Sequence, residues 1–381
     1  MTQQYDTIVV GLGGMGSAAA YQLASRGRRV LGLEQFTPAH SQGSSHGKSR
    51  IIRQAYFEDP SYVPLLQRAY ELWDQIERES GQRLLTPTGG LMIGTADSRT
   101  FGGSLRSAQT HGLPHEVLDA GDLRRRYPML RPDSDTMALY ETRAGVLDPE
   151  ATVWAHLQRA MASGADLRFG QSVTGWEADG DGVRVITAGG TYRAETLVLT
   201  PGPWAPQLMA DLDLPLTVTR QTFYWFAPIG GGAPFAIGRF PIFIWEVEDG
   251  NQIYGFPEQP GQPGVKAAPF YHGPSGDADT IDRLVRDADV DYARALLSRY
   301  IPALGGDVVN TATCLYTETP DHHFVLSLHP RHLNVAIASP CSGHGYKFCS
   351  VIGEILADLA TTGTTGHPIG LFDPARFAAR V

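Results

Sequence analysis

Near its start the sequence has a strand, a glycine-rich turn and a helix in direct succession, and this unit limits the fold more than any other feature. Residues 7–10 are mostly β-branched and predict a buried strand. Gly11, Gly13 and Gly16 follow at the spacing Gly-x-Gly-x-x-Gly, and apolar residues then recur at helical period as far as Gly27. The first glycine permits a tight turn, the second admits a pyrophosphate, and the third lets the helix pack on the strand. The unit predicts a parallel α/β fold with an anion site at the helix N-terminus.

A second strand, residues 29–33, ends on Glu34. An acid about 20 residues after such a glycine turn accepts hydrogen bonds from ribose hydroxyls. Glu34 argues against a 2′-phosphate, which would require an arginine there, but it does not distinguish NAD from FAD. The polar loop at residues 41–50 could donate hydrogen bonds to phosphate, although a solvated surface loop would have the same composition. We therefore predict a dinucleotide site, with a glycine-rich turn of no binding function as the alternative.

Composition narrows the class of protein. Charged residues make up 19% of the chain and hydrophobic residues 42%, which is typical of a globular protein. The net charge of −9 and the absence of lysine and arginine runs argue against nucleic acid and anionic membranes as partners. Three cysteines cannot build a disulfide framework, and no apolar stretch reaches the about 18 residues of a membrane helix. Because no signal peptide precedes the first strand, we expect a cytoplasmic protein.

A second strand–turn–helix unit lies near the other end of the sequence. Residues 333–338 predict a strand, Gly343 and Gly345 a turn, and the apolar residues from Phe348 onward a helix that ends at Gly363. The N-terminus of this helix again favours negative charge. Two such sites suggest one cofactor long enough to reach both. The second could face the pyrimidine edge of an isoalloxazine, which becomes anionic on reduction. FAD fits better than NAD, because nothing in the sequence resembles the separate catalytic histidine and carboxylate of a simple alcohol dehydrogenase.

The element pattern predicts a mixed α/β (α+β) protein with two discontinuous domains. The first is a Rossmann-like FAD-binding domain formed by residues 1–83, 149–214 and 303–381. The second is a substrate-binding domain built on an antiparallel sheet covered by helices, formed by residues 84–148 and 215–302. A helix is expected at 277–298. The aromatic residues between 223 and 256 are expected in the core more often than on a binding surface.

Several motifs, in the same order along the chain, are similar to those of a known family. They are residues 11–16, Ser44-Ser45-His46-Gly47 with Arg50-Ile51-Ile52-Arg53, Tyr254-Gly255-Phe256-Pro257, Cys314-Leu315-Tyr316-Thr317 with Pro320-Asp321, and Ser342-Gly343-His344-Gly345-Tyr346-Lys347-Phe348. On these residues the chain resembles the FAD-dependent monomeric sarcosine oxidase and N-methyltryptophan oxidase family, within the glycine/D-amino-acid oxidase-like flavoproteins. The resemblance covers nearly the whole chain and implies a monomer that binds FAD.

The resemblance implies catalytic roles for several residues. Arg53 and Lys347 match a pair that grips the substrate carboxylate, a task suited to a bidentate guanidinium and a point charge. Lys266 matches a lysine, bridged by water to flavin N5, that promotes reaction with oxygen, and Arg50 would be its neighbour across the ring. The side chains expected to line the substrate pocket are Tyr254, Tyr316 and His272. The alternatives are a surface lysine at Lys266 and a purely structural Arg–Lys pair.

The resemblance also implies the residues around FAD. Cys314 matches a cysteine that forms a thioether to the flavin 8-methyl carbon, although most free cysteines are ordinary buried residues. Val173 matches a backbone contact to the adenine. His344 is expected to be a turn residue rather than an acid–base catalyst. The expected cofactor-binding residues are Gly11, Gly13, Gly14, Met15, Gly16, Glu34, Gln35, Ser44, Ser45, Ser49, Arg50, Val173, Cys314, Gly343, Gly345 and Lys347, and no metal is expected.

The reaction implied by the family is the oxidation of a secondary α-amino acid, N-methylated or cyclic, such as sarcosine or N-methyltryptophan. A hydride equivalent would pass from the carbon next to nitrogen to flavin N5, the imine would hydrolyse, and O2 would be reduced to H2O2. A dehydrogenase that passes electrons to a carrier is one alternative, and a non-catalytic flavin-binding protein is another. The substrate is left open, because sarcosine, N-methyltryptophan, pipecolate and proline analogues all suit a carboxylate clamp with aromatic walls.

Three departures from the family pattern fall around the expected pocket. Lys48 stands where the family more often has an acid. Ser339-Pro340-Cys341 replaces a sequence of small residues and phenylalanine, and two extra residues separate Lys266 from His272. These departures bear on the substrate rather than on the flavin chemistry.

Overall fold

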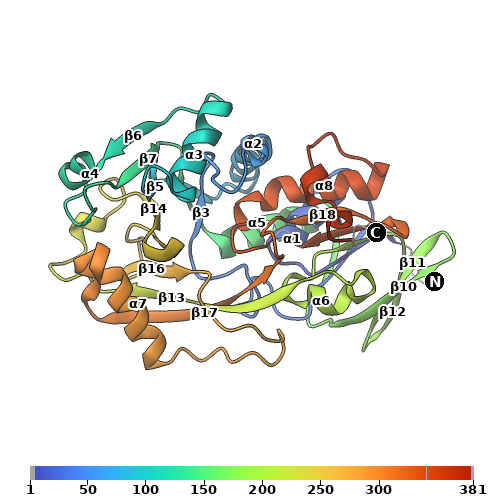
Figure 1. The fold of residues 1–381 in the computed structure, drawn as a ribbon. Coiled ribbons are helices and arrows are strands. Elements are labelled where there is room, and N and C mark those ends of the chain that lie inside the picture. The colour runs from blue at the N-terminus through green and yellow to red at the C-terminus, as the bar shows by residue number, and fades with distance from the viewer. Residues whose placement is uncertain (1–4, 340, 379–381) are drawn as a thin grey trace.

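The structure, a computed structural model, describes residues 5–339 and 341–378, so Pro340 lies outside the described residues. The described residues form two eight-stranded sheets and one three-stranded sheet. Figure 1 shows the two large sheets in opposite halves of the molecule, with the long strands β13 and β17 crossing the middle. The predicted class, a mixed α/β fold with a Rossmann-like unit and a largely antiparallel second sheet, is confirmed.

The first sheet has the strand order β10-β11-β12-β1-β2-β9, with β19 paired to β12 and β18 paired to β19. Its pairs β12–β1, β1–β2, β2–β9 and β12–β19 are parallel. Parallel strands are covered on both faces, and Ile8 and Val9 on β1 are accordingly fully buried. The strands are β1 (Tyr5–Val10), β2 (Val30–Leu33), β9 (Asp166–Arg168), β10 (Val173–Asp179), β11 (Gly182–Thr187), β12 (Gly190–Leu199), β18 (Val325–His329) and β19 (His332–Ser339).

Four helices are associated with the first sheet, and they are α1 (Gly14–Ser25), α2 (Val63–Ser80), α5 (Pro149–Ala162) and α8 (Cys349–Thr362). Helix α1 packs against both α5 and α8. A run of small residues allows the close approach, since a Cβ atom on Gly353 of α8 would lie 2.6 Å from the carbonyl carbon of Ala18 on α1. This contact joins the first and last helices of the described chain.

The second sheet has the strand order β17-β13-β16-β15-β14-β5-β7-β6 and is antiparallel except between β14 and β5. Aromatic side chains fill its core, and Phe226 and Phe243 are fully buried there, as their composition predicted. The strands are β5 (Gly90–Gly94), β6 (Glu116–Asp119), β7 (Met137–Glu141), β13 (Thr217–Phe226), β14 (Ile242–Glu246), β15 (Gln252–Gly255), β16 (Val265–Phe270) and β17 (Val308–Glu318). The associated helices are α3 (Arg99–Thr110), α4 (Ala120–Arg126) and α7 (Asp287–Tyr300).

The third sheet is small, and its three short strands lie along the chain between strands of the first sheet and strands of the second. It has the order β3-β8-β4, with the strands β3 (Arg50–Ile52), β4 (Leu85–Pro87) and β8 (Gly145–Leu147). Strand β3 leads directly into Arg53. The short helix α6 (Ala205–Leu208) follows β12. Within the described residues, no helix combines the length and apolarity required to cross a membrane.

Two sequence expectations deserve comparison with the observed elements. The helix expected at 277–298 is wrong in its first part, because α7 begins only at Asp287. Aspartate side chains accept hydrogen bonds from nearby backbone N–H groups in this segment, Asp277 from Asp279 and Asp282 from Leu284, at 2.9 Å each. These bonds replace helical bonding.

The division into two domains stays a prediction. Strand β17, which falls in the segment predicted for the first domain, pairs in the second sheet.

Candidate active site

The turn between β1 and α1 exposes backbone to a cavity. Gly11 has a φ of +82°, and a Cβ atom there would lie 2.4 Å from the carbonyl oxygen of Thr200. The N–H of Gly14, in the first turn of α1, donates to Ser45 Oγ at 3.0 Å. A Cβ atom on Gly16 would lie 1.7 Å from the carbonyl oxygen of Gly11, so only glycine lets the helix pack this closely. The glycine positions thus have the geometry that the sequence pattern predicts.

Glu34 is held rigidly at the end of β2. Its two carboxylate oxygens accept hydrogen bonds from the backbone N–H groups of Leu12 and Phe36, at 2.9 and 3.0 Å. Burial opposes ionisation, but hydrogen bonds from His40 and from these two amides hold the pKa of Glu34 below its ordinary value. The carboxylate therefore stays ionised at the cavity, where it can accept further hydrogen bonds from hydroxyl groups.

The second glycine turn, between β19 and α8, lies against the first. Gly343 has a φ of +73°, and a Cβ atom there would lie 2.7 Å from the ring of Tyr316. A Cβ atom on Gly14 would lie 2.5 Å from Cys349 Sγ and 3.0 Å from the ring of Tyr346. The N-terminus of α1 and the turn that precedes α8 are therefore in contact, although they come from opposite ends of the sequence.

Both turns border one cavity, whose empty space is about 1860 Å³ including open solvent at its mouth. Of the residues expected at the site, only Gly16 and His272 do not line it. Those that line it are Gly11, Gly13, Gly14, Met15, Glu34, Gln35, Ser44, Ser45, Ser49, Arg50, Arg53, Val173, Tyr254, Lys266, Cys314, Tyr316, Gly343, Gly345 and Lys347. The cavity thus draws together side chains from all three sheets.

His272 lies outside the cavity for a local backbone reason. Strand β16 ends at Phe270, which lines the cavity, and Tyr271 then adopts a φ of +55°. The hydroxyl of Tyr271 donates to the carbonyl of Ser342 at 2.6 Å. His272 is exposed, and its ring stacks on Tyr292 with the centroids 4.1 Å apart. Phe270 is therefore the side chain of this segment that the structure places at the cavity.

Lys266, on β16, is fully enclosed at the cavity wall. Its Nζ donates to the carbonyl oxygens of Gly47 and Ser49, at 2.7 and 3.1 Å. The same nitrogen lies 4.2 Å from the ring centroid of Phe223 and 5.0 Å from that of Phe256. Burial, followed by the charge of Arg50, lowers the pKa of Lys266 well below its ordinary value. The surroundings of Lys266 thus disfavour its protonated form, which negative charge placed nearby would stabilise.

Arg50 and Cys314 lie on the same cavity. The guanidinium of Arg50 donates to the carbonyl oxygens of Ser49 and Ser44, at 2.9 and 2.8 Å. Cys314, on β17, is buried, and burial raises the pKa of its thiol, whereas the charges of Arg50 and Lys266 act in the opposite direction. The cysteine is therefore a buried thiol beside two basic side chains, whose charges favour the thiolate whereas burial favours the thiol.

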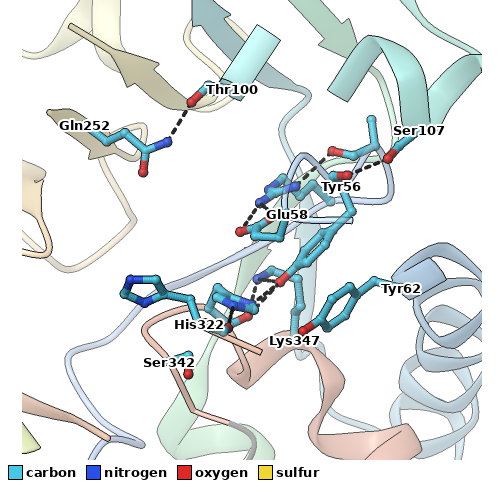
Figure 2. A network of polar contacts seen from close by, with 12 residues as sticks. Tyr56, Glu58, Tyr62, Thr100, Ser107, Gln252, His322, Ser342 and Lys347 are labelled. Carbon is cyan, nitrogen blue, oxygen red and sulfur yellow. Dashed lines mark hydrogen bonds and ion pairs between the residues drawn. The ribbon is translucent and has the colours of Figure 1, made fainter. Parts of the chain in front are cut away.

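Arg53, Glu58 and Lys347 form a buried charged group that we call the clamp cluster; Figure 2 shows Glu58 and Lys347 in it. One terminal nitrogen of Arg53 donates to both carboxylate oxygens of Glu58, at 2.8 and 2.7 Å. The guanidinium carbon also lies 4.2 Å from the ring centroids of both Tyr56 and Phe57. The arginine predicted to bind a substrate carboxylate thus already binds a carboxylate of the protein.

Lys347 occupies the other side of the clamp cluster. Its Nζ donates to the carbonyl oxygen of His344 at 2.5 Å and to the hydroxyl of Tyr56 at 3.5 Å. Burial, followed by the charge of Arg53, lowers the pKa of Lys347 to about 7, while Glu58 acts in the opposite direction. Burial would raise the pKa of Glu58, but Arg53, His344 and Lys347 together bring it below its ordinary value. The cluster therefore holds a carboxylate, a guanidinium and a lysine that titrates near neutrality.

Two glutamates near the clamp cluster were not predicted from the sequence. Glu58 follows Arg53 by five residues, and their pairing depends on how the loop between them folds. Glu141, on β7, accepts three hydrogen bonds of 2.8 to 3.0 Å from the N–H groups of Gln54 and Ala55. Burial raises the pKa of Glu141. This carboxylate fixes the turn after Arg53 to the second sheet, and no local sequence pattern indicates it.

Unpartnered buried polar atoms indicate a polar ligand in the cavity. Ser49 Oγ and Arg53 Nε are both buried, and both lack a hydrogen-bond partner among the described residues. With the glycine turn for a pyrophosphate, Glu34 for ribose hydroxyls, and basic side chains for an electron-rich ring, the cavity residues fit a flavin dinucleotide.

Known proteins resemble this chain over nearly its whole length. A family model described as FAD dependent oxidoreductase matches residues 6–359. A monomeric sarcosine oxidase of Streptomyces avermitilis is 55% identical over 381 residues, covering 100% of this chain and 99% of that protein. An N-methyl-L-tryptophan oxidase of Salmonella enteritidis is 33% identical over 377 residues, covering 98% and 100%. The solved structure of NikD, an unusual amino acid oxidase essential for nikkomycin biosynthesis, has 29% identity and a TM-score of 0.84, and 98% of each chain is covered.

Proposed function

The chain belongs to the FAD-dependent oxidoreductase family, and on that premise we propose that it is an oxidase of secondary α-amino acids with O2 as the electron acceptor. The observation that carries the proposal is the clamp cluster, in which Arg53 binds a carboxylate near the charge of Lys347, on the same cavity as Lys266. The reaction takes two electrons and two protons from adjacent C–H and N–H bonds to give an imine and reduces O2 to H2O2. Water then hydrolyses the imine.

The clamp cluster supports recognition of a substrate carboxylate by exchange. Arg53 would release Glu58 and bind the substrate carboxylate in its place. Lys347, whose pKa burial lowers to about 7, would take up its proton most readily when a carboxylate arrives. A ligand that lacks a carboxylate cannot displace Glu58. The cluster therefore favours amino acids over simple amines.

The remaining cavity walls suit the amine end of such a substrate. Tyr254, Phe270 and Tyr316 present aromatic rings to the cavity. Burial raises the pKa of both tyrosines, so their hydroxyls remain neutral. An aromatic site of low polarity disfavours an ammonium ion, and the neutral amine is the form that can be oxidised. The walls thus complement the clamp by favouring the reactive protonation state.

Bound FAD supplies the two-electron acceptor that the side chains lack. The glycine turn, Glu34 and Val173 would hold its dinucleotide part, and Cys314 would carry a covalent link to the ring system. The Cys314 sulfur would form a C–S bond as one S–H and one C–H proton leave, with the two released electrons passing to oxygen. We expect acid-precipitated protein to stay yellow and Cys314→Ala to release its colour into the supernatant. Colour retained in the Cys314→Ala precipitate would exclude this cysteine.

Lys266 is the proposed site of oxygen activation. Its amine is buried among two carbonyl groups and aromatic rings, and the described residues give it no hydrogen-bonded carboxylate. Negative charge that develops on oxygen during its reduction would be stabilised by protonated Lys266, which is worth most in such a water-poor site. A dehydrogenase would not need this group. The rate of the oxygen reaction therefore distinguishes an oxidase from a dehydrogenase.

A test of the proposed function starts from the purified yellow protein. Anaerobic addition of sarcosine, N-methyltryptophan, pipecolate or proline should bleach the flavin absorbance for at least one of them, and air should restore it with release of H2O2. Bleaching without fast recovery in air would instead favour a dehydrogenase. Absence of bleaching by all secondary amino acids would favour a non-catalytic flavin-binding protein. A monomeric, cytoplasmic enzyme is part of the proposal, and the name of the Streptomyces relative supports the monomer.

A further inference from the structure

Tyr56 lies between Arg53 and Glu58 in sequence and is fully buried within the cluster of polar contacts in Figure 2. One face of its ring receives the guanidinium of Arg53, whose carbon is 4.2 Å from the ring centroid. The backbone carbonyl of Tyr56 accepts a hydrogen bond from Ser107 Oγ at 2.5 Å. The backbone of Tyr56 is thus held by a hydrogen bond, and its ring contacts one cation of the clamp cluster, Arg53.

The hydroxyl of Tyr56 has a direction that its neighbours determine. His344 Nε2 lies 2.9 Å from the carbonyl oxygen of His322, which can only accept, so Nε2 carries the proton. His344 Nδ1 is then an acceptor, and it lies 2.6 Å from the Tyr56 hydroxyl. Tyr56 therefore donates to His344, and its oxygen lone pairs remain for Lys347 Nζ at 3.5 Å. The His344 carbonyl, 3.2 Å from the same hydroxyl, is the longer of its two possible acceptors.

We propose that Tyr56 is a positioning residue that couples the two cations of the clamp cluster, its ring seating Arg53 and its His344-oriented hydroxyl accepting from Lys347. The inference rests on the proposed function, because it concerns how the clamp binds a substrate carboxylate. It assigns a task to His344 as well, which is to orient a hydroxyl rather than to exchange protons with substrate. Lys347 then keeps N–H groups free for the cavity, which a substrate carboxylate can accept.

A neighbouring tyrosine provides a matched control. The ring of Tyr62 lies 4.9 Å from that of Tyr56, and Tyr62 is also fully buried. Its hydroxyl contacts His323 Nδ1 at 3.0 Å and, within the described residues, makes no hydrogen bond to the clamp cluster. Burial raises the pKa of both tyrosines, so both hydroxyls keep their protons. Removing either hydroxyl therefore costs a buried polar contact, but only one of them touches Lys347.

The experiment compares Tyr56→Phe with Tyr62→Phe in the FAD-loaded enzyme. The probes are methoxyacetate, an isostere of sarcosine without an oxidisable amine, and its neutral partner methoxyacetamide, with binding measured by calorimetry. We expect Tyr56→Phe to weaken methoxyacetate binding about fivefold, the size of one ordinary hydrogen bond, and to leave methoxyacetamide binding unchanged. KM for the best substrate should rise by about the same factor, with kcat changed by less than about twofold. Tyr62→Phe should leave both affinities as they are.

Equal affinities for methoxyacetate in Tyr56→Phe and wild type, or the same loss in both phenylalanine variants, would overturn the inference. If the wild-type enzyme itself does not prefer methoxyacetate over methoxyacetamide, the proposed function fails instead. Melting temperature and flavin spectrum check that each variant is folded. If Tyr56→Phe does not fold, His344→Leu removes the Nδ1 acceptor and puts no polar atom in its place. That variant should show the same selective loss for the carboxylate, and equal affinities there would also overturn the inference.

Discussion

Two lysines line the same cavity, and the difference between their surroundings separates two tasks. Lys266 donates to two backbone carbonyls and lies against aromatic rings. The carboxylate that affects its pKa is Glu150, which acts through its charge and not through a hydrogen bond. Lys347 donates to a carbonyl and a hydroxyl beside Arg53 and the resident carboxylate Glu58. Burial lowers the pKa of both lysines.

Lys266 and Lys347 show that one residue type can serve two steps of a reaction. Because no described residue places an anion within hydrogen-bonding distance of Lys266, any negative charge that arrives there is stabilised without competition. Lys347 lies near Glu58, which is bound to Arg53 and whose charge acts on the lysine, so an arriving anion must compete with a carboxylate that is already present. The first environment suits a transient charge, whereas the second suits selection of a bound carboxylate.

The largest effect on ligand binding is expected from Arg53→Ala, which would remove the selectivity of the site that contains Lys347. It removes the charged partner of a carboxylate in a buried site, and truncating one partner of such a pair costs roughly 2 to 5 kcal/mol. We expect methoxyacetate to bind at least about 30-fold more weakly, while methoxyacetamide changes little. Calorimetry of both ligands checks this. Equal losses for the acid and the amide would show that Arg53 supports the fold of the site rather than the carboxylate.

The pH dependence of carboxylate binding sharpens the contrast between the lysines. Lys347, with a pKa lowered by burial to about 7, loses its proton as the pH rises, so methoxyacetate affinity should fall about tenfold by about pH 9. Burial lowers the pKa of His344 to about 3, and that of Glu58 is also lowered, so neither titrates in this range. Lys347→Met should flatten the profile. A wild-type profile that is already flat would contradict the assignment.

A smaller effect of opposite sign is expected from Glu58→Gln. The substitution removes the carboxylate that is bound to Arg53. Methoxyacetate should therefore bind about fivefold more tightly at about pH 6, where Lys347 is protonated. The advantage should shrink at higher pH, because Glu58 also helps Lys347 to retain its proton. Calorimetry at both pH values measures the change. Weaker binding at the lower pH would mean that Glu58 organises the clamp instead of competing for it.

Local patterns were enough to predict the cofactor side of the cavity. The positions of Gly11, Gly13 and Gly16 follow from turn and packing geometry within one strand–turn–helix unit, and Glu34 follows from the strand next to it. These features need only short stretches of sequence. The family resemblance supplied most of the remaining cavity residues, which come from strands far apart along the chain.

Features set by a single backbone angle or by contacts distant in sequence were not predictable. His272 was expected at the pocket, but the positive φ of Tyr271 directs it to the surface and leaves Phe270 at the cavity. The pairing of Glu58 with Arg53 depends on how a buried loop folds back on itself. Glu141 reaches that loop from another sheet, and no periodicity records such a contact.

The most direct test of the two-lysine account is a stopped-flow experiment that separates flavin reduction by substrate from flavin reoxidation by O2. We predict that Lys266→Met slows reoxidation about 100-fold or more and leaves the substrate concentration for half-maximal reduction unchanged. Lys347→Met should raise that substrate concentration and leave reoxidation at the wild-type rate. If both variants impair the same step, the two lysines do not have separate tasks and the account is wrong.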